Sequence, residues 1–537
     1  MGGRRGTLSP TTPVCPPDTL GEIDYEGRLS NSGPRKSGRR EIIVWRVKSL
    51  DAVSEVDERK SLRRSLGPLQ LTLLGIGSTI GTGIFVLTAE AAQQAGPGML
   101  VSFILAAFVC GIATLCYAEM SAMAPVSGAA YAYAYVSFGE FWAWAVGWAL
   151  VLEYAITGSA VAVGWSGYFV GLLKGSVFHI VVPPSLANGP YAGGVINLPA
   201  VIISILVTLL LVRGTKESAR VNALFVAVKV VVLAIFIALS LPLLHASNFH
   251  PFAPLGVSGI ASASASIFFT FVGFDAVATA AEETREPQRN IPLGLFGALS
   301  VVTIIYVLVA IGVTGAYGSQ PLFGPHGEYL SPGSLGLGKA CESITASGTS
   351  GPLVCSQEAL AFVLRQIGYP LFANLLGLVA FLALPSVILM MIYGQTRVFF
   401  VMSRDGLLPR ALSRVHPRWQ TPHIMTLGTG TAVTVAAAFL PVGRLAAIAN
   451  SGTLFAFFMV SLAVLRLRRT DPQRVRPFRV AVVWIIAPLS AAGCVLLFLF
   501  LSTEAKLVLP VWSAIGLLIY ISYGVRKSRM ARRPEAK

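Results

Sequence analysis

Two short runs of residues interrupt apolar segments of this chain, and both have the composition of a ligand-binding site. The first, Gly75-Ile76-Gly77-Ser78-Thr79-Ile80-Gly81-Thr82-Gly83, lies in the apolar segment 69–95, and the second is Phe268-Phe269-Thr270-Phe271-Val272-Gly273-Phe274-Asp275. Glycines should break a helix there. Such a break persists in a membrane only where it is buried in protein or lines a cavity, because hydrocarbon leaves freed backbone groups unsatisfied. In a transporter, the substrate itself can satisfy them.

A broken helix offers both halves of a site for a zwitterion. The half-helix that begins near Gly81 presents free N–H groups and the positive end of its dipole, which suit a carboxylate. Gly81 and Gly83 let a ligand approach the backbone, and Thr82 adds a hydroxyl group. The carbonyl ends of the preceding half-helices suit an ammonium group. These contacts are made by backbone groups, so selectivity must come from side chains.

Three charged residues lie inside apolar segments, where ionisable groups are functional candidates by default. Glu153 either faces the pocket and balances a cationic substrate or is a structural group bonded to neighbouring helices. Asp275 either lines the pocket or neutralises the amides freed at the second break. Lys229 lies among valines with no acid nearby in sequence, and desolvation favours its neutral form, as a proton carrier requires. Alternatively, Lys229 snorkels to the cytoplasmic face, which is strained from about 15 Å inside the helix.

The composition indicates a membrane protein that could position these residues. The chain has 537 residues, of which 54% are hydrophobic and only 12% charged. Its mean hydropathy of +0.70 is too high for a soluble globule. Apolar runs long enough to span a bilayer recur along the chain. We expect an all-α integral membrane fold with twelve transmembrane helices, at 69–95, 98–123, 139–173, 197–212, 218–245, 259–281, 292–317, 370–402, 423–440, 443–465, 480–501 and 507–524.

The distribution of charge gives the expected orientation. The net charge of +16 does not indicate nucleic-acid binding, because with the N-terminus inside, all but six of the 41 Lys and Arg residues fall on one side. The six exceptions are Lys229 within a helix and Lys174, Lys339, Arg365, Arg444 and Lys506 outside. By the positive-inside rule, both termini are expected in the cytoplasm.

The two breaks lie in the first and sixth predicted helices, which indicates an inverted repeat of five plus five helices. Paired interruptions at equivalent positions of two halves point to a binding site between them. Glycines in membrane helices can instead permit close packing alone. We expect a transporter domain at 67–525, with repeats at 69–245 and 259–465 and extra helices at 480–524. It would lie between a largely disordered cytoplasmic tail, 1–66, and a basic cytoplasmic tail, 526–537.

Several motifs resemble one known family. Gly77 to Phe85, Tyr117-Ala118-Glu119-Met120 and Pro125 to Tyr131 are similar to the amino acid, polyamine and organocation (APC) transporters. The match narrows to the bacterial form of the cationic amino acid transporter branch at Leu152-Glu153-Tyr154, Gly273-Phe274-Asp275, Ala281-Glu282-Glu283-Thr284, Tyr393 to Arg397 and Met402 to Pro409. The resemblance covers roughly residues 60–525.

The resemblance carries expectations for fold and site. It implies a LeuT-like inverted repeat with helices one and six broken. It also implies that the substrate carboxylate meets amides around Thr82 and Gly83, while carbonyls near Thr79, Phe269 and Val272 take the amine. Lys229 would stand where sodium-coupled relatives bind an ion, touching the first break.

These observations predict proton-coupled uptake of L-amino acids by alternating access in the bacterial cytoplasmic (inner) membrane. A proton-independent exchanger and a non-transporting amino acid sensor remain alternatives. No cofactor, metal or enzymatic activity is expected, and the partners are the amino acid, protons and membrane lipid. The choice between cationic and small neutral substrates stays open, because Met390 and Met391 would form an apolar wall if they reach the pocket. Cys341 and Cys355 share a loop expected outside, where a disulfide is allowed but not established.

Overall fold

The computed structural model describes residues 47–48, 66–126, 128–175, 180–214, 219–347, 351–419 and 421–528. The two expected tails, 1–66 and 526–537, lie almost entirely outside these ranges. Only Val47, Lys48, Leu66 and residues 526–528 of the tails are described.

Helices make up the described secondary structure, together with two isolated β-bridges, Leu66 to Thr284 and Phe323 to Tyr329. Nine helical segments in the described ranges are long and apolar enough to cross a membrane. They are Gly83–Met123, Glu140–Gly175, Ala223–Leu243, Gly256–Thr279, Pro287–Ala316, Pro370–Arg404, Val442–Thr470, Val483–Phe500 and Thr503–Lys527, and two shorter apolar helices are Leu198–Arg213 and His423–Phe439. The all-helical membrane architecture is confirmed, and the count of twelve crossings stays a prediction.

Both predicted helix breaks are present. The first helix consists of α2 (Pro68–Thr79), an extended residue Ile80, a wide turn η2 (Gly83–Leu87) and α3 (Thr88–Ala95). The sixth consists of α10 (Gly256–Ile267), a tight turn η7 (Phe268–Phe271), extended Val272 and α11 (Ala276–Thr279). The first regular helix continues through Gly75 and Gly77 and ends at Thr79, before Gly81, and the second ends at Ile267, before Gly273, so both interruptions lie within the predicted segments.

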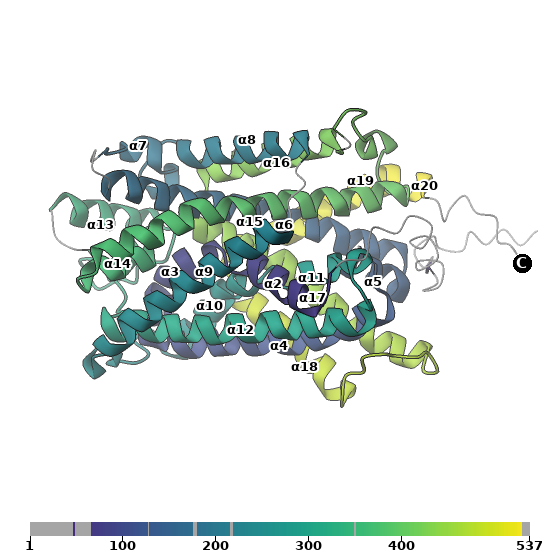
Figure 1. Cartoon of the computed structure of the whole chain (residues 1–537), viewed down its shortest axis with the longest axis horizontal. Helices are drawn as coiled ribbons and strands as arrows, with labels where there is room; N and C mark the ends of the chain where they lie inside the picture. Colours follow the sequence, from purple (N-terminus) through teal and green to yellow (C-terminus); the bar gives the residue numbers. More distant parts are fainter. Residues whose placement is uncertain are drawn as a thin grey trace, which may run out of the picture. The chain divides into compact units, whose positions relative to one another are not determined.

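Long helices surround the broken ones (Figure 1). The helices α6 (Glu140–Gly175) and α15 (Pro370–Arg404) pack along each other, and α17 (Val442–Thr470) packs on α6. The short helix α2 packs against α12 (Pro287–Ala316) and α9 (Ala219–Ser240). The first break therefore lies in the interior of the bundle, and Ile80, Gly81 and Thr82 are buried. Further helices are α4 (Met99–Met123), α5 (Ala129–Phe138), α8 (Leu198–Arg213), α16 (His423–Phe439), α18 (Val483–Phe500) and α19 (Thr503–Ile519).

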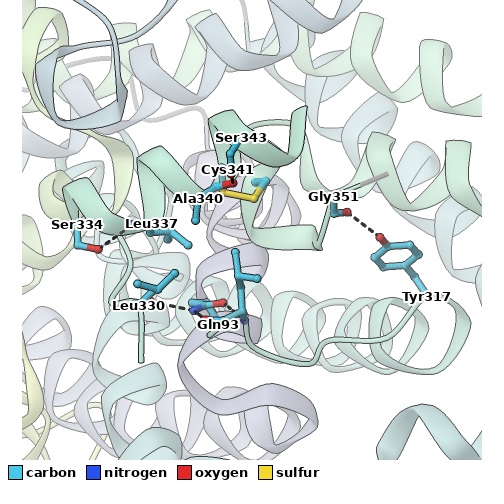
Figure 2. The surroundings of a disulfide bond; sticks show 11 residues. Gln93, Tyr317, Leu330, Ser334, Leu337, Ala340, Cys341, Ser343 and Gly351 are labelled. Carbon is cyan, nitrogen blue, oxygen red and sulfur yellow. Dashed lines mark hydrogen bonds between the residues drawn. A yellow bond between two sulfur atoms is a disulfide. The ribbon is translucent and has the colours of Figure 1, made fainter. Parts of the chain in front are cut away.

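The connection between α12 and α15 is folded and cross-linked (Figure 2). Cys341 in α13 (Leu335–Ala346) forms a disulfide with Cys355, so the bond that the sequence left open is present. The buried Gln93 amide near the end of α3 binds this connection through the carbonyl groups of Leu322 and Leu330, at 2.7 and 2.8 Å. The first broken helix is therefore hydrogen-bonded directly to the loop.

Candidate functional site

The two helix breaks meet in the interior of the protein. The Ser78 hydroxyl donates a hydrogen bond of 2.7 Å to the carbonyl group of Gly273. Gly273 has a φ of +113°, which side chains disfavour, and a Cβ atom there would lie 2.7 Å from the Ser78 carbonyl oxygen. A Cβ atom on Gly83 would lie 2.6 Å from the Cα atom of Thr270. Glycine is therefore required at both breaks for the backbones to approach each other.

Two side chains from outside the broken helices bind the carbonyl end of α2. The Tyr306 hydroxyl of α12 donates to the Thr79 carbonyl oxygen at 3.0 Å, and the Lys229 ammonium of α9 donates to the Gly77 carbonyl oxygen at 3.1 Å. Lys229 is only 1% exposed. Its side chain therefore points to the first break rather than to the membrane surface, as the family resemblance implies and the snorkelling alternative does not.

The threonine hydroxyls at the first break are directed into the protein. Thr79 donates to the Gly75 carbonyl oxygen of its own helix at 2.7 Å, and Thr82 lies 3.4 Å from the Val161 carbonyl oxygen of α6. The polar groups that remain for a ligand around Gly81 are consequently those of the backbone.

A cavity of about 250 Å³ adjoins both breaks. Ser78 contributes from the first break and Val272, Gly273 and Asp275 from the second, while α6 and α15 supply Tyr154 and the pair Met390 and Met391. Apolar groups form much of the wall, including Leu73, Leu74 and Leu389. The two methionines therefore reach the cavity, which the sequence left conditional.

One end of this cavity is lined by an ion pair. Glu283, just after α11, and Arg397 of α15 both line it, and their charged atoms are 3.4 Å apart. Leu66, immediately before α2, lines the same end and accepts a hydrogen bond of 2.9 Å from the Arg285 amide. The two broken helices and α15 are thus joined at this end.

Of the predicted substrate-binding residues, Val272 and Asp275 line this cavity, whereas Thr79, Gly81, Thr82, Gly83, Glu153 and Phe269 do not. The Glu153 side chain is 1% exposed, and neither carboxylate oxygen has a hydrogen-bond partner among the described residues. It is absent from the lining of the cavity as described and lies beside Gly452 of α17. Phe269 is buried in an apolar cluster with Leu87 and Leu445. Only its carbonyl group is available for the predicted role.

A second cavity, of about 480 Å³, lies beside α3 and is lined by Val86, Glu90 and the disulfide pair, among other residues. Because η2 and α3 contribute to this cavity and α2 to the smaller one, the first break separates two hollow regions.

Sequence reasoning missed several residues of the site. Tyr306 and Tyr154 lie in apolar helices, and only their hydroxyl groups distinguish them from packing residues. Ser78 belongs to the glycine-rich run 75–83, but nothing in that run indicates that its hydroxyl reaches the second break. Asn450 of α17 also reaches the sixth helix, since its amide donates to the Ala265 carbonyl oxygen at 2.7 Å.

Outside the site, Glu119 pairs with two basic residues. The Arg468 guanidinium binds its two carboxylate oxygens at 2.8 and 2.7 Å, and Arg476 lies at 3.3 Å. Glu119 is fully buried at the end of α4, so it ties α4 to α17.

A multi-pass helical membrane protein with a buried site between two interrupted helices has the architecture of a transporter. The amino acid permease family model matches residues 66–522. The chain therefore belongs to the amino acid permease family, within the APC superfamily. It is a transporter of amino acids and not an enzyme.

Similar proteins are named for different substrates. The chain is 40% identical to a branched-chain amino acid permease, BcaP, of Bacillus subtilis over 91% of its length and 99% of the relative's. It is 39% identical to the methylthioribose transporter of the same organism, over 90% and 98%. Cationic amino acid transporter 2 of Arabidopsis thaliana is 34% identical over 80% of this chain and 63% of its own.

Proposed function

We propose that this protein is a secondary active transporter that imports L-amino acids together with protons. The observation that carries the proposal is the buried Lys229 ammonium on the Gly77 carbonyl oxygen, since it joins a titratable group to the helix break. A lysine there can hold a proton in one state of the cycle and release it in another.

The proposed architecture has twelve crossings and a LeuT-like five-plus-five repeat with both termini in the cytoplasm. The paired breaks and the two cavities on either side of the first break support it. The bacterial relatives support a location in the cytoplasmic membrane. Alternating access would open one cavity at a time to its own side.

Substrate binding is proposed at the two breaks. The amides of Gly81, Thr82 and Gly83 would bind the carboxylate, because they begin the second half of the first helix. The carbonyl groups of Thr79, Phe269 and Val272 would bind the ammonium group. The Thr79 carbonyl oxygen already accepts the Tyr306 hydroxyl, but a carbonyl oxygen has two lone pairs and can accept a second donor.

Proton coupling would act through the same backbone. Charged Lys229 donates to Gly77 and holds α2 against α9. A neutral lysine binds a carbonyl group more weakly, because hydrogen bonds from ionised donors are roughly twice as strong. Loss of the proton would therefore loosen the segment that carries the substrate site, which links proton release to the movement of helix one.

We propose that the preferred substrate is an amino acid with a neutral aliphatic side chain. Met390, Met391 and Leu389 give the cavity an apolar wall, and the cation Arg397 lines one end. The carboxylate of Glu153, which could have balanced a cationic substrate, is outside the lining. The name of the branched-chain permease relative is consistent with this choice. Asp275 in the wall favours a second candidate, a cationic amino acid.

Transport by purified protein in proteoliposomes tests the proposal. With an inward proton gradient, the wild type should accumulate leucine or isoleucine in preference to lysine, and a protonophore should abolish the accumulation. Lys229→Met should lose gradient-driven accumulation and Lys506→Met, an outer-side lysine, should not. Undiminished gradient-driven uptake by Lys229→Met would overturn the coupling role.

The same assay separates the alternatives. Uptake that occurs only into vesicles preloaded with amino acid, with no response to the proton gradient, would indicate an exchanger. Amino acid binding without flux would indicate a sensor. Binding can be measured by thermal shift, because a ligand that binds only the folded state raises its apparent stability.

A further inference from the structure

A groove formed by α8, α15 and the loop before α16 has the composition of a phospholipid site. Its volume is about 600 Å³, and small-molecule sites in proteins span roughly 300–1,000 Å³. Aliphatic side chains of α8 supply most of the wall, α15 contributes Pro385, and the loop contributes Trp419. Within the described lining, Arg213 is the only charged residue. The groove is therefore apolar along its length and cationic at one end.

The apolar wall is open to the surroundings of the protein. Leu206, Leu209 and Leu210 each leave about half of their surface exposed, although α8 packs on α15 and α16 on its other sides. In a membrane protein, hydrocarbon can cover such a surface at no cost in exposed apolar area. An acyl chain is thus the natural occupant of the space between these leucines and Pro385.

The proline in this wall leaves no unsatisfied polar group behind it. Pro385 lacks an amide hydrogen, so the Phe381 carbonyl oxygen loses its partner within α15. The Trp165 indole of α6 donates to that oxygen at 2.8 Å instead. The wall at Pro385 consequently stays apolar and does not need water.

The cationic end of the groove lies at the last residue of α8. Arg213 is exposed, and it forms no ion pair with any of the described residues. The Thr421 hydroxyl donates to the Val212 carbonyl oxygen at 2.7 Å, and the Gly214 amide donates to that of Leu211 at 3.1 Å. These bonds satisfy two of the carbonyl groups freed at the end of α8, which would otherwise disfavour an anion.

The loop before α16 is folded so that Trp419 lies at the same end. The His416 Nδ1 atom accepts hydrogen bonds from the amides of Arg418 and Trp419 at 3.2 and 3.3 Å, and the His416 ring stacks on the indole with centroids 4.3 Å apart. Arg418 is exposed and adds a second positive charge to this loop. Tryptophan prefers the level of the lipid headgroups, with its ring toward hydrocarbon and its N–H toward the polar layer.

We propose that this groove binds one anionic phospholipid, with an acyl chain along α8 and the phosphodiester group on Arg213. Charge complementarity selects this occupant, because basic pockets between membrane helices bind anionic headgroups and no acidic side chain lines the groove as described. The inference does not depend on amino acid transport. In the proposed orientation of the chain, the headgroup lies in the cytoplasmic leaflet.

Native mass spectrometry of the purified full-length protein counts bound lipids directly. The protein is titrated, in a neutral detergent, with phosphatidylglycerol or with phosphatidylcholine that carries the same acyl chains. We expect one phosphatidylglycerol to bind about fivefold more tightly than phosphatidylcholine, the factor that one basic residue contributes near a lipid surface. Arg213→Gln should remove this preference. Phosphatidylglycerol should also raise the thermal midpoint of the wild type.

Matched variants separate the groove from the rest of the surface. Leu209→Trp fills the groove and should weaken the binding of both lipids, whereas Leu518→Trp, an exposed leucine of α19, should not. Arg526→Gln removes an exposed cation from α20 (Val525–Lys527) and should keep the preference for phosphatidylglycerol. An equal loss in Arg526→Gln and Arg213→Gln would overturn the proposal, because it would show a general effect of net charge.

Three further results would reject the site. Equal binding of the two lipids by the wild type would exclude recognition of an anionic headgroup. Inorganic phosphate that displaces phosphatidylglycerol at similar concentrations would show a site for free anions rather than for lipid. A dimer mass that disappears in Leu209→Trp, with no lipid adduct in the wild type, would assign the groove to a second copy of the chain.

Discussion

A single methyl group at the first helix break should be enough to disable the site. In Gly83→Ala, the new Cβ atom would lie 2.6 Å from the Thr270 Cα atom and 2.9 Å from its Cβ atom. Ordinary carbon contacts need about 3.5 Å, so the two broken helices must separate by nearly 1 Å. Because the obstacle is backbone, no rotamer change relieves it. Overpacking of this kind costs typically about 2 kcal/mol.

The matched control is Gly158→Ala in α6, a buried glycine whose Cβ atom would lie 3.5 Å from Val433 and 3.6 Å from Met391. Both substitutions add the same methyl group, and both remove glycine's backbone freedom in the unfolded chain, so their difference isolates the contact between helices one and six. If the overpacking destabilises only the conformation in which the two breaks are in contact, a cost of about 2 kcal/mol corresponds to about 30-fold weaker amino acid binding. Binding is measured by ligand-induced thermal shift, and initial uptake rates are measured in proteoliposomes. If the amino acid affinity of Gly83→Ala lies within threefold of that of Gly158→Ala, the conclusion that the binding site requires close contact between the two breaks is refuted.

Three further perturbations test other parts of the molecule. Glu119→Gln leaves the buried Arg468 without its anion, so the thermal midpoint in detergent should fall by an amount equivalent to about 3 kcal/mol, and an unchanged midpoint would show that the ion pair is not needed. Burial raises the pKa of Glu358 from 4.5 to about 7, although the ion pair with Arg365 acts in the opposite direction. The folded protein therefore binds this proton more tightly than the unfolded chain does. The resulting contribution to the free energy of unfolding should be lost as pH rises from about 4.5 to about 7. Glu358→Gln should show a smaller decline in thermal midpoint over that range than the wild type, and equal declines would contradict the assignment. Cys341→Ser opens the cross-link to Cys355, so a protease added on the outer side should cut the loop faster while the helices stay resistant, and an unchanged cutting rate would exclude a role in ordering the loop.

The positions of the helix breaks could be predicted because their causes are local. A glycine cluster in the first apolar segment and a glycine followed by an aspartate in the second weaken a regular helix wherever the rest of the chain lies, and both breaks occur within the predicted segments. The all-helical membrane class follows equally from composition, which sums over many residues. Fold class and break position therefore depend on information that a sequence contains directly.

The direction of individual side chains could not be predicted in the same way. Glu153 and Tyr154 are neighbours on α6, yet only Tyr154 lines the cavity, because successive residues of a helix point about 100° apart. Deciding which of the two faces the site requires the rotation of α6 about its axis. That rotation is set by packing against α15 and α17, which are distant in sequence. The Tyr306 contact with Thr79 is likewise a consequence of packing between α12 and α2.

The position of Lys229 suggests why proton and substrate sites could share one structural element. Its ammonium group binds the Gly77 carbonyl oxygen, and Gly77 belongs to the same helical turn as Ser78 and Thr79. Ser78 holds the second break, and the Thr79 carbonyl group is a proposed contact for the substrate ammonium. A change in the charge of Lys229 therefore acts on the turn that carries both connections, without a relay of intermediate side chains. If coupling works in this way, Lys229→Met should abolish the dependence on the proton gradient while leaving exchange across the membrane measurable, because the proposed substrate contacts are backbone groups that the substitution does not remove.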